Sequence, residues 1–409
     1  MLLVRLLDKA IRTGSLTLVD PAGTSHHLGR DGDGQDVAIR LHDRRVGRRL
    51  FFDPRLALGE AYMDGTLTVE KGDIYDFLDL MLRNLGVHNT LPMDWLRHLV
   101  GRVGRRLQQY NPLGKAHKRV QHHYDLSGAL YDLFLDGDRQ YSCAYFPAPD
   151  LSLEAAQAAK KQHIAAKLLL EPGLRVLDIG SGWGGMGLYL ADTADIELTG
   201  VTLSREQHVV SERRAAEAGM SDRVHFDLRD YREIDGRFDR IVSIGMFEHV
   251  GVPHYPEYFA KIADLLTDDG IALLHSIGRM DGPGATSPWI RKYIFPGGYS
   301  PALSEVIPVI ERCGLWITDV EILRLHYAET LREWRRRFLA NRDKIADIYD
   351  ERFCRMWEFY LAGSEVTFRY SGHMVFQIQM AKRIDAVPPT RDYIYERDRR
   401  KGRRDEIAA

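Results

Sequence analysis

The chain has 409 residues, of which 44% are hydrophobic, so it is long enough for two or three domains, and no apolar run matches the length of a membrane span. Its formal net charge of -2 and its pI near 6.8 give no indication of nucleic acid as a partner. The three cysteines, Cys143, Cys313 and Cys354, have the spacing of neither a disulfide framework nor a metal site, and we therefore expect a cytoplasmic protein without a metal.

Residues 1–95 are predicted to form a small mixed domain. The expected elements are helices at 2–11, 56–62 and 74–85 and strands at 16–19 and 37–41, separated by turns rich in Asp and Gly. No segment of this domain has a catalytic pattern. Packing, dimerisation and substrate presentation all stay open as its role.

Residues 96–120 are interpreted as a basic linker. Between Arg97 and Arg119 there are seven Lys or Arg and no acidic residue, interleaved with apolar side chains. A basic helix with an apolar stripe suits the surface of an anionic bilayer. A solvated linker helix that packs its stripe on a neighbouring domain explains the pattern equally well.

Residues 121–390 alternate between strand and helix patterns. Helices are expected at 153–169, 205–218, 258–266, 331–338 and 349–363, and strands at 176–179, 197–201, 224–226, 238–244, 271–276, 316–322 and 374–380. This alternation predicts an α/β fold with a doubly wound, Rossmann-like, mostly parallel sheet, whose last strand we expect to be antiparallel. The long excursion 279–300 is a candidate lid, and residues 391–409, with seven basic and five acidic side chains, are expected to be a frayed tail.

A glycine-rich turn follows the first strand of this domain. Asp178 ends the strand, and Gly180, Gly182 and Gly184 follow it. Such a turn lets the backbone approach a nucleotide-like group at the carboxyl end of the sheet. The turn lacks the third glycine of the dinucleotide pattern and the Lys-Ser/Thr ending of a phosphate loop, which favours S-adenosylmethionine as the ligand.

The loops after the other strands also carry polar residues. The second strand ends in Val201-Thr202 rather than in an acid, so Thr202 and Gln207 are expected to hold the ribose hydroxyls. Asp230 is placed to accept a hydrogen bond from the adenine amino group, and Glu248 to lie near the transferred methyl. For each residue alone, a satisfied loop hydrogen bond is the commoner explanation. Five consecutive polar loops favour a site.

Five segments together resemble the cyclopropane-fatty-acyl-phospholipid synthases and the related mycolic acid methyltransferases. They are Tyr141-Ser-Cys-Ala-Tyr145, Leu177-Asp-Ile-Gly-Ser-Gly-Trp-Gly-Gly185, Gly200-Val-Thr-Leu-Ser204 with Gln207, Gly245-Met-Phe-Glu-His-Val-Gly251 and Tyr293-Ile-Phe-Pro-Gly297. The segment Leu58-Gly-Glu-Ala-Tyr-Met-Asp-Gly65 resembles the N-terminal domain of the phospholipid enzymes, which the mycolic acid enzymes lack. The resemblance therefore favours a phospholipid substrate.

The resemblance implies a definite reaction, in which a methylene group passes from S-adenosylmethionine to a cis double bond of an acyl chain and bound bicarbonate removes a proton. The residues that match the family's bicarbonate site are Cys143, Glu248, His275, Ile277 through its backbone, and Tyr327. Those that match its cofactor contacts are Tyr141, Ser142, Gly180, Gly182, Thr202, Gln207, Asp230 and Tyr231. The resemblance also implies a homodimer that associates peripherally with the inner face of an unsaturated phospholipid membrane.

One position departs from the family. Ser364 stands where many of the synthases have cysteine, so no nucleophilic role is expected there. Three alternatives stay open: a fatty-acyl methylase that forms a methyl branch or a methylated alkene, a methyltransferase for a small soluble nucleophile, and a lipid- or cofactor-binding protein without activity.

Overall fold

The computed structural model describes residues 2–29, 34–85 and 128–396. Residues 2–85 form an N-terminal unit around a four-stranded sheet of order β2-β1-β3-β4. Its strands are β1 (Ser15–Val19), β2 (Ser25–Gly29), β3 (Asp36–Leu41) and β4 (Leu67–Lys71), and its helices are α1 (Leu2–Ala10), α2 (Arg44–Phe52), α3 (Pro54–Met63) and α4 (Ile74–Leu85). β1 pairs with β3 in parallel, and the other two pairings are antiparallel.

Three elements of this unit have no clear pattern in the sequence. Helix α2 contains four arginines and a glycine, and only Val46, Gly47 and Leu50 are buried, so its apolar stripe is narrow. Asp43 nevertheless caps it by accepting a hydrogen bond from the Arg45 N–H. Strands β2 and β4 lie at the two edges of the sheet, where one fully buried side chain each is enough to hold them.

The larger sheet has seven strands in the order β10-β11-β9-β8-β5-β6-β7. They are β5 (Arg175–Ile179), β6 (Glu197–Thr202), β7 (Val224–Leu228), β8 (Phe238–Ile244), β9 (Leu266–Arg279), β10 (Trp316–Leu323) and β11 (His373–Ala381). Only β11 runs antiparallel to its neighbours. The predicted doubly wound sheet with an antiparallel last strand is confirmed.

Helices cover both faces of this sheet because the central strands are apolar on both sides. Val176 packs under α8 (Leu153–Lys167), α9 (Gly185–Thr193) and α10 (Arg205–Glu217), whereas its neighbour Leu177 packs under α11 (Tyr255–Leu265) and α13 (Leu303–Arg312). Strand order reverses between β5 and β8, so the loops after these two strands diverge and leave a crevice at their carboxyl ends.

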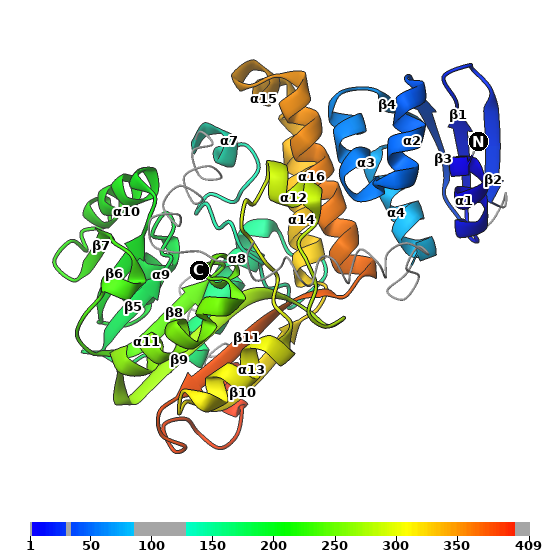
Figure 1. Cartoon of the computed structure of the whole chain (residues 1–409). Coiled ribbons are helices and arrows are strands. Elements are labelled where there is room, and N and C mark those ends of the chain that lie inside the picture. Colours follow the sequence, from blue (N-terminus) through cyan, green and yellow to red (C-terminus); the bar gives the residue numbers. More distant parts are fainter. Residues whose placement is uncertain (1, 30–33, 86–127, 397–409) are drawn as a thin grey trace.

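A third group of helices lies between the sheet and the N-terminal unit (Figure 1). It comprises α7 (Gly128–Asp132), α12 (Pro288–Tyr293), α14 (His326–Ala340), α15 (Arg342–Ile348) and α16 (Glu351–Tyr370). Helix α16 contacts α3 and α4, and its Ala362 and Val366 belong to the apolar core of the N-terminal unit. Polar bonds join the same surfaces: the Tyr62 hydroxyl donates to Glu358 at 3.0 Å, and Arg352 pairs with Asp64 at 2.8 Å.

The expected frayed tail is wrong for its first residues. Ile394 is fully buried, the Tyr393 hydroxyl lies 3.0 Å from Gln379 Oε1, and Arg391 pairs with Asp319 at 2.9 Å. Residues 391–396 therefore pack on the outer strands because three side chains find specific partners there. The basic linker 96–120 and residues 397–409 lie outside the described residues. In the described part of the chain, no helix has both the length and the apolar composition to cross a bilayer.

Candidate active site

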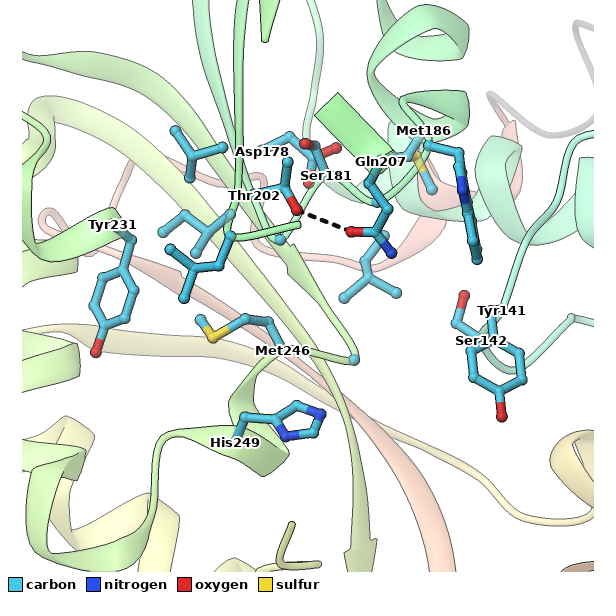
Figure 2. Close-up of a pocket in the computed structure, with 18 of the residues that line it drawn as sticks. Tyr141, Ser142, Asp178, Ser181, Met186, Thr202, Gln207, Tyr231, Met246 and His249 are labelled. Atoms are coloured by element: carbon cyan, nitrogen blue, oxygen red, sulfur yellow. Dashed lines mark hydrogen bonds between the residues drawn. The ribbon is translucent and has the colours of Figure 1, made fainter. Parts of the chain in front are cut away.

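A pocket lies at the carboxyl ends of β5, β6 and β8, and we call it the strand-end pocket. Figure 2 shows Asp178, Thr202 and Gln207 above its centre, Tyr141 with Ser142 on one side and Tyr231 on the other. Nine of the ten predicted cofactor residues line it: Tyr141, Ser142, Asp178, Gly180, Gly182, Thr202, Gln207, Asp230 and Tyr231. The order of strands and loops thus located the pocket, while Tyr141 and Ser142 came from the family resemblance.

Gly184 does not line the strand-end pocket, and its role as a cofactor contact stays a prediction. It begins α9 at φ +81°, and a Cβ there would lie 2.8 Å from the Phe226 ring and 2.9 Å from Ser211. Gly180, by contrast, has φ +84° and faces the pocket loop, where a Cβ would lie 2.8 Å from Cβ of Met246. Both positions need glycine, but Gly184 needs it for packing.

Two ionisable groups are buried at the base of the strand-end pocket. Burial raises the pKa of Asp178 to about 7, although the Lys160 charge acts in the opposite direction. The Asp178 Oδ2 atom has no hydrogen-bond partner among the described residues. Lys160 is fully buried and donates to Gln140 Oε1 at 2.7 Å and to Ser142 Oγ at 2.8 Å, and burial lowers its pKa to about 8. Lys160 thereby holds segment 140–142 in place, which lines the pocket.

Thr202 and Gln207 contact each other in the pocket. The Thr202 hydroxyl donates to Gln207 Oε1 at 2.8 Å (Figure 2). Ser204 caps α10 by accepting from the Gln207 N–H, which places Gln207 in the first turn of the helix. The pair is therefore fixed before any ligand binds.

The Asp230 carboxylate has a protein partner. It accepts from the Arg232 guanidinium through two bonds of 2.8 Å and from the Arg232 backbone N–H at 3.0 Å. A carboxylate has about four acceptor positions, so room for one more donor remains. Its role toward an adenine amino group stays a prediction.

A larger cavity of about 440 Å³ adjoins the strand-end pocket, and we call it the large cavity. The two share the side chains of Tyr141, Ser142 and His249 and the backbone of Gly245. All five residues predicted for an anion site line the large cavity: Cys143, Glu248, His275, Ile277 and Tyr327. The structure therefore brings together residues that are up to 184 positions apart in the sequence.

Glu248 follows β8 in a short 3-10 helix and is buried. Its Oε1 atom accepts the Ile277 backbone N–H at 2.7 Å, while Oε2 has no hydrogen-bond partner among the residues described. Burial raises the pKa of this carboxyl to about 7, and the bond from Ile277 opposes the rise. Glu248 is thus poised to gain or lose a proton near neutral pH. The backbone N–H of Ile277 is thus engaged by Glu248, and a contact of the Ile277 backbone with a bound anion stays a prediction.

His275 lies on β9 and is also buried. Its Nδ1 atom is 3.1 Å from the Gln377 side-chain amide on β11. Burial, together with the positive charges of Lys160 and Lys167, holds the pKa of His275 well below its usual range. The imidazole is therefore neutral and can donate or accept a hydrogen bond.

Cys143 and Tyr327 complete the predicted set. Burial raises the pKa of the Cys143 thiol well above its ordinary value, and the thiol donates to the Ala144 carbonyl at 3.2 Å, so it is not a thiolate nucleophile. Tyr327 packs its ring against Phe368 at 4.8 Å and edge-on against Trp334 at 5.8 Å. Ser364 also lines this cavity.

Sequence reasoning missed one wall of the large cavity. The N-terminal unit supplies Pro54, Arg55 and Leu58 from α3 and Leu78 and Leu82 from α4. The resemblance of Leu58–Gly65 to a family segment was the available signal. It indicated a relationship to the phospholipid enzymes but not that this segment lies against the cavity. A further part of the lining comes from segment 279–300, the candidate lid, which supplies Trp289 and Ile290 of α12 among others.

Several residues of the strand-end pocket were also missed. They are Asp138, Gln140, Trp183, Met246 and His249. Asp138 and Gln140 precede the recognised segment 141–145, and Met246 and His249 lie inside the quoted segment 245–251, so proximity to these motifs was the signal. In the described part of the chain, no cluster of His, Cys, Asp and Glu could hold a metal ion.

Comparison with known proteins shows the family of this chain. Residues 112–378 match the family model described as mycolic acid cyclopropane synthetase. The chain belongs to this family. The recognition from sequence is therefore confirmed, and the chain is an S-adenosylmethionine-dependent methyltransferase.

Individual members of the family are similar over different lengths. The cyclopropane-fatty-acyl-phospholipid synthase of Escherichia coli strain K12 is 39% identical over 347 residues, which cover 85% of this chain and 88% of that protein. The tuberculostearic acid methyltransferase of Mycobacterium tuberculosis is 37% identical over 344 residues, covering 81% and 78%. The crystal structure of mycolic acid cyclopropane synthase CmaA1 complexed with SAH and CTAB is 33% identical with a TM-score of 0.62, and covers 66% of this chain and 99% of that one.

Proposed function

We propose that this enzyme transfers a methylene group from S-adenosylmethionine to the cis double bond of an unsaturated phospholipid acyl chain and forms a cyclopropane ring. The observation that carries the proposal is the junction of the two cavities. The strand-end pocket meets the large cavity at Tyr141, Ser142 and His249, and the buried Glu248 and His275 lie just beyond it. A methyl donor and an acyl chain can meet there, near Glu248, a carboxyl that can accept a proton, and the neutral imidazole of His275.

The residues of the strand-end pocket suit the donor. When bound, S-adenosylmethionine supplies an electrophilic methyl group, as the SAH complex of the related synthase supports. Thr202 and Gln207 would hold the ribose hydroxyls, and Asp178, one oxygen of which has no partner among the described residues, would accept a hydrogen bond from the ligand. Tyr141 would be held at the junction by stacking on Trp334 at 5.1 Å and by the Tyr360 hydroxyl at 3.0 Å.

The large cavity suits an alkene that becomes a carbocation. An alkene is a weak nucleophile, so the site must hold it close to the donor and exclude water from the cation that forms. Tyr327, Phe295 and Phe359 line the cavity with aromatic faces, which stabilise positive charge. Loss of a proton from the cation then closes the three-membered ring.

The residues around Glu248 fit a small anion such as bicarbonate, which would supply a general base when bound. The unpartnered Glu248 Oε2 can accept a hydrogen bond from a protonated oxygen, and the neutral His275 can donate or accept one. Because the pKa of Glu248 is about 7, this carboxyl can also take the proton onward. The Cys143 thiol, being protonated, contributes no competing negative charge.

The N-terminal unit supports phospholipid as the substrate class. Residues 86–409 make up less than four fifths of the chain, so the 85% match to the E. coli phospholipid synthase must extend into this unit. The solved mycolic acid synthase accounts for only 66% of the chain. We therefore place the substrate in a phospholipid bilayer, with the enzyme bound peripherally at the cytoplasmic surface.

A methylase is the second candidate because the tuberculostearic acid methyltransferase is nearly as similar to this chain. Loss of a different proton from the same cation would give a methylated alkene. Both candidates are tested by incubating the protein with S-adenosylmethionine, bicarbonate and vesicles of monounsaturated phospholipid, followed by mass spectrometry of the fatty acids. Both products are one methylene heavier than the substrate, so the recovered fatty acids are then treated with hydrogen under conditions that reduce double bonds. A heavier product that takes up no hydrogen supports the ring, and one that takes up hydrogen supports the methylase. An unchanged lipid contradicts both.

A further inference from the structure

One wall of the large cavity comes from outside the catalytic domain, and its residues differ in chemistry. Leu58, Leu78 and Leu82 are apolar and face a cavity that an acyl chain can fill. Arg55 lines the same cavity from α3, one turn before Leu58. An acyl chain that lies against the leucines would therefore pass beside a guanidinium.

Arg55 marks the outer end of this wall. Among the described residues that line the cavity, it is the exposed one, whereas Glu248 and His275 are buried. The lining thus combines buried groups at the proposed reaction centre, apolar side chains, and a cation at the solvent. A phospholipid has matching parts: the double bond within the acyl chain, the chain itself, and a phosphodiester at the water interface.

The surroundings of Arg55 add positive potential. Helix α2, which ends at Phe52 directly before α3, carries Arg44, Arg45 and Arg48 on its exposed side and no acidic residue. Its fourth arginine, Arg49, pairs with Glu60. Asp53 is the one acidic residue between positions 44 and 55. The Phe52 side chain beside this surface is 54% exposed, an apolar group next to cations, as suits a lipid interface.

On the basis of the proposed function, we propose that Arg55 binds the phosphodiester of the phospholipid whose acyl chain occupies the large cavity. The N-terminal unit then selects a substrate with a phosphate over a neutral lipid with the same acyl chains. Guanidinium suits this role because it forms bidentate, charge-assisted hydrogen bonds to phosphate oxygens. The distance from rim to reaction centre would also set which double bond reaches Glu248.

An internal competition measures the selectivity directly. Dioleoylphosphatidylglycerol and dioleoylglycerol are mixed at equal amounts in neutral detergent micelles, and methyl transfer to each is counted by mass spectrometry, which gives the ratio of the two kcat/KM values. We expect Arg55→Gln to lower the phospholipid to diacylglycerol ratio about tenfold, the contribution typical of one charged hydrogen bond, and Arg55→Lys to retain most of it.

Controls distinguish phosphate binding at Arg55 from general electrostatic attraction between the basic surface and an anionic lipid. Arg48 lies on the same basic surface but outside the cavity. Arg48→Gln should therefore leave the phospholipid to diacylglycerol ratio unchanged in neutral micelles. A ratio that stays the same in Arg55→Gln contradicts the proposal, whether both rates fall together or neither falls. Millimolar inorganic phosphate that inhibits both lipids equally would indicate a site for free phosphate and would also overturn it.

The outcome is separable from that of the proposed function. A wild-type protein that modifies neither lipid contradicts the proposed function alone. The subsite is then tested by equilibrium binding of the two lipids in the same micelles, where the tenfold loss of phospholipid preference in Arg55→Gln is still expected and its absence refutes the subsite.

Discussion

The strand-end pocket and the large cavity are built in different ways. The strand-end pocket is formed mainly by consecutive loops after β5, β6, β7 and β8, so its residues follow one another in the sequence. The large cavity is formed by α3 and α4 of the N-terminal unit, by α12, and by α14 and α16 near the C-terminus. The strand-end pocket therefore depends mainly on one sheet, whereas the large cavity forms only when three parts of the chain have packed together.

This difference has a consequence for mutations. A change in the strand-end pocket should alter donor binding and leave lipid selection intact. A change in the large cavity should do the reverse, including a change in the N-terminal unit far from the chemistry. Substitutions in each cavity and the pH dependence of turnover test that separation.

Glu248→Gln should reduce turnover by ~10² or more while donor affinity stays within about twofold of wild type, because the substitution keeps the shape and removes the proton acceptor. Turnover is measured by mass spectrometry and donor affinity by calorimetry. The matched control is Glu358→Gln, a buried carboxyl on α16 that accepts from Tyr62 and lines neither cavity. Unchanged turnover in Glu248→Gln removes this carboxyl from the mechanism.

Gly180→Ala should weaken donor binding ~10–30-fold. Alanine at φ +84° costs ~1–2 kcal/mol, and its Cβ would displace the Met246 side chain that lines the strand-end pocket. Gly219→Ala is the control, because Gly219 has φ +66° with no atom within 4 Å of a Cβ and lies outside both cavities. If both variants weaken the donor equally, general destabilisation explains the effect and the local account fails.

The two cavities were also unequally predictable. The glycine turn, Thr202 and Gln207 could be placed because a parallel sheet brings the ends of its strands to one edge, whatever the rest of the chain does. The packing of Gly184 against Phe226 could not be predicted, because spacing alone does not distinguish a glycine that faces a ligand from one that faces another side chain. Arg55 and Leu78 could not be placed, since no local pattern records which surface of another domain a helix will contact.

The pH profile gives a third test, and it concerns the large cavity. Because the pKa of Glu248 is raised to about 7, the carboxyl is mostly protonated at pH 6 and mostly ionised at pH 8. If the ionised form accepts the proton, kcat should rise about tenfold over this interval at constant bicarbonate. His275, whose pKa is well below its usual range, contributes no change.

Asp178 also has a pKa of about 7, so its ionisation must be separated from that of Glu248. Asp178 lines only the strand-end pocket, and its titration should appear in the KM for the donor and be lost in Asp178→Asn. The rise in kcat should persist in Asp178→Asn and disappear in Glu248→Gln. A rise that persists in both variants shows that neither carboxyl is responsible.

Gly59→Ala should lower kcat/KM for phospholipid about three- to tenfold without changing donor affinity. Gly59 lies on α3 against the buried indole of Trp289, and a Cβ would overlap that ring, so α12 must shift or the contact must strain by ~1–3 kcal/mol. Trp289 also donates its indole N–H to the Met63 sulfur at 3.2 Å, which limits its freedom to move aside.

A second substitution decides whether this overlap is the cause. Trp289→Phe removes part of the ring, so the double variant Gly59→Ala/Trp289→Phe should lose less than the sum of the two single losses. Additive losses would show that Gly59 acts elsewhere. A Gly59→Ala variant with wild-type kcat/KM on phospholipid would show that α3 does not set the shape of the large cavity. Donor binding and lipid selection would then both be determined within the catalytic domain.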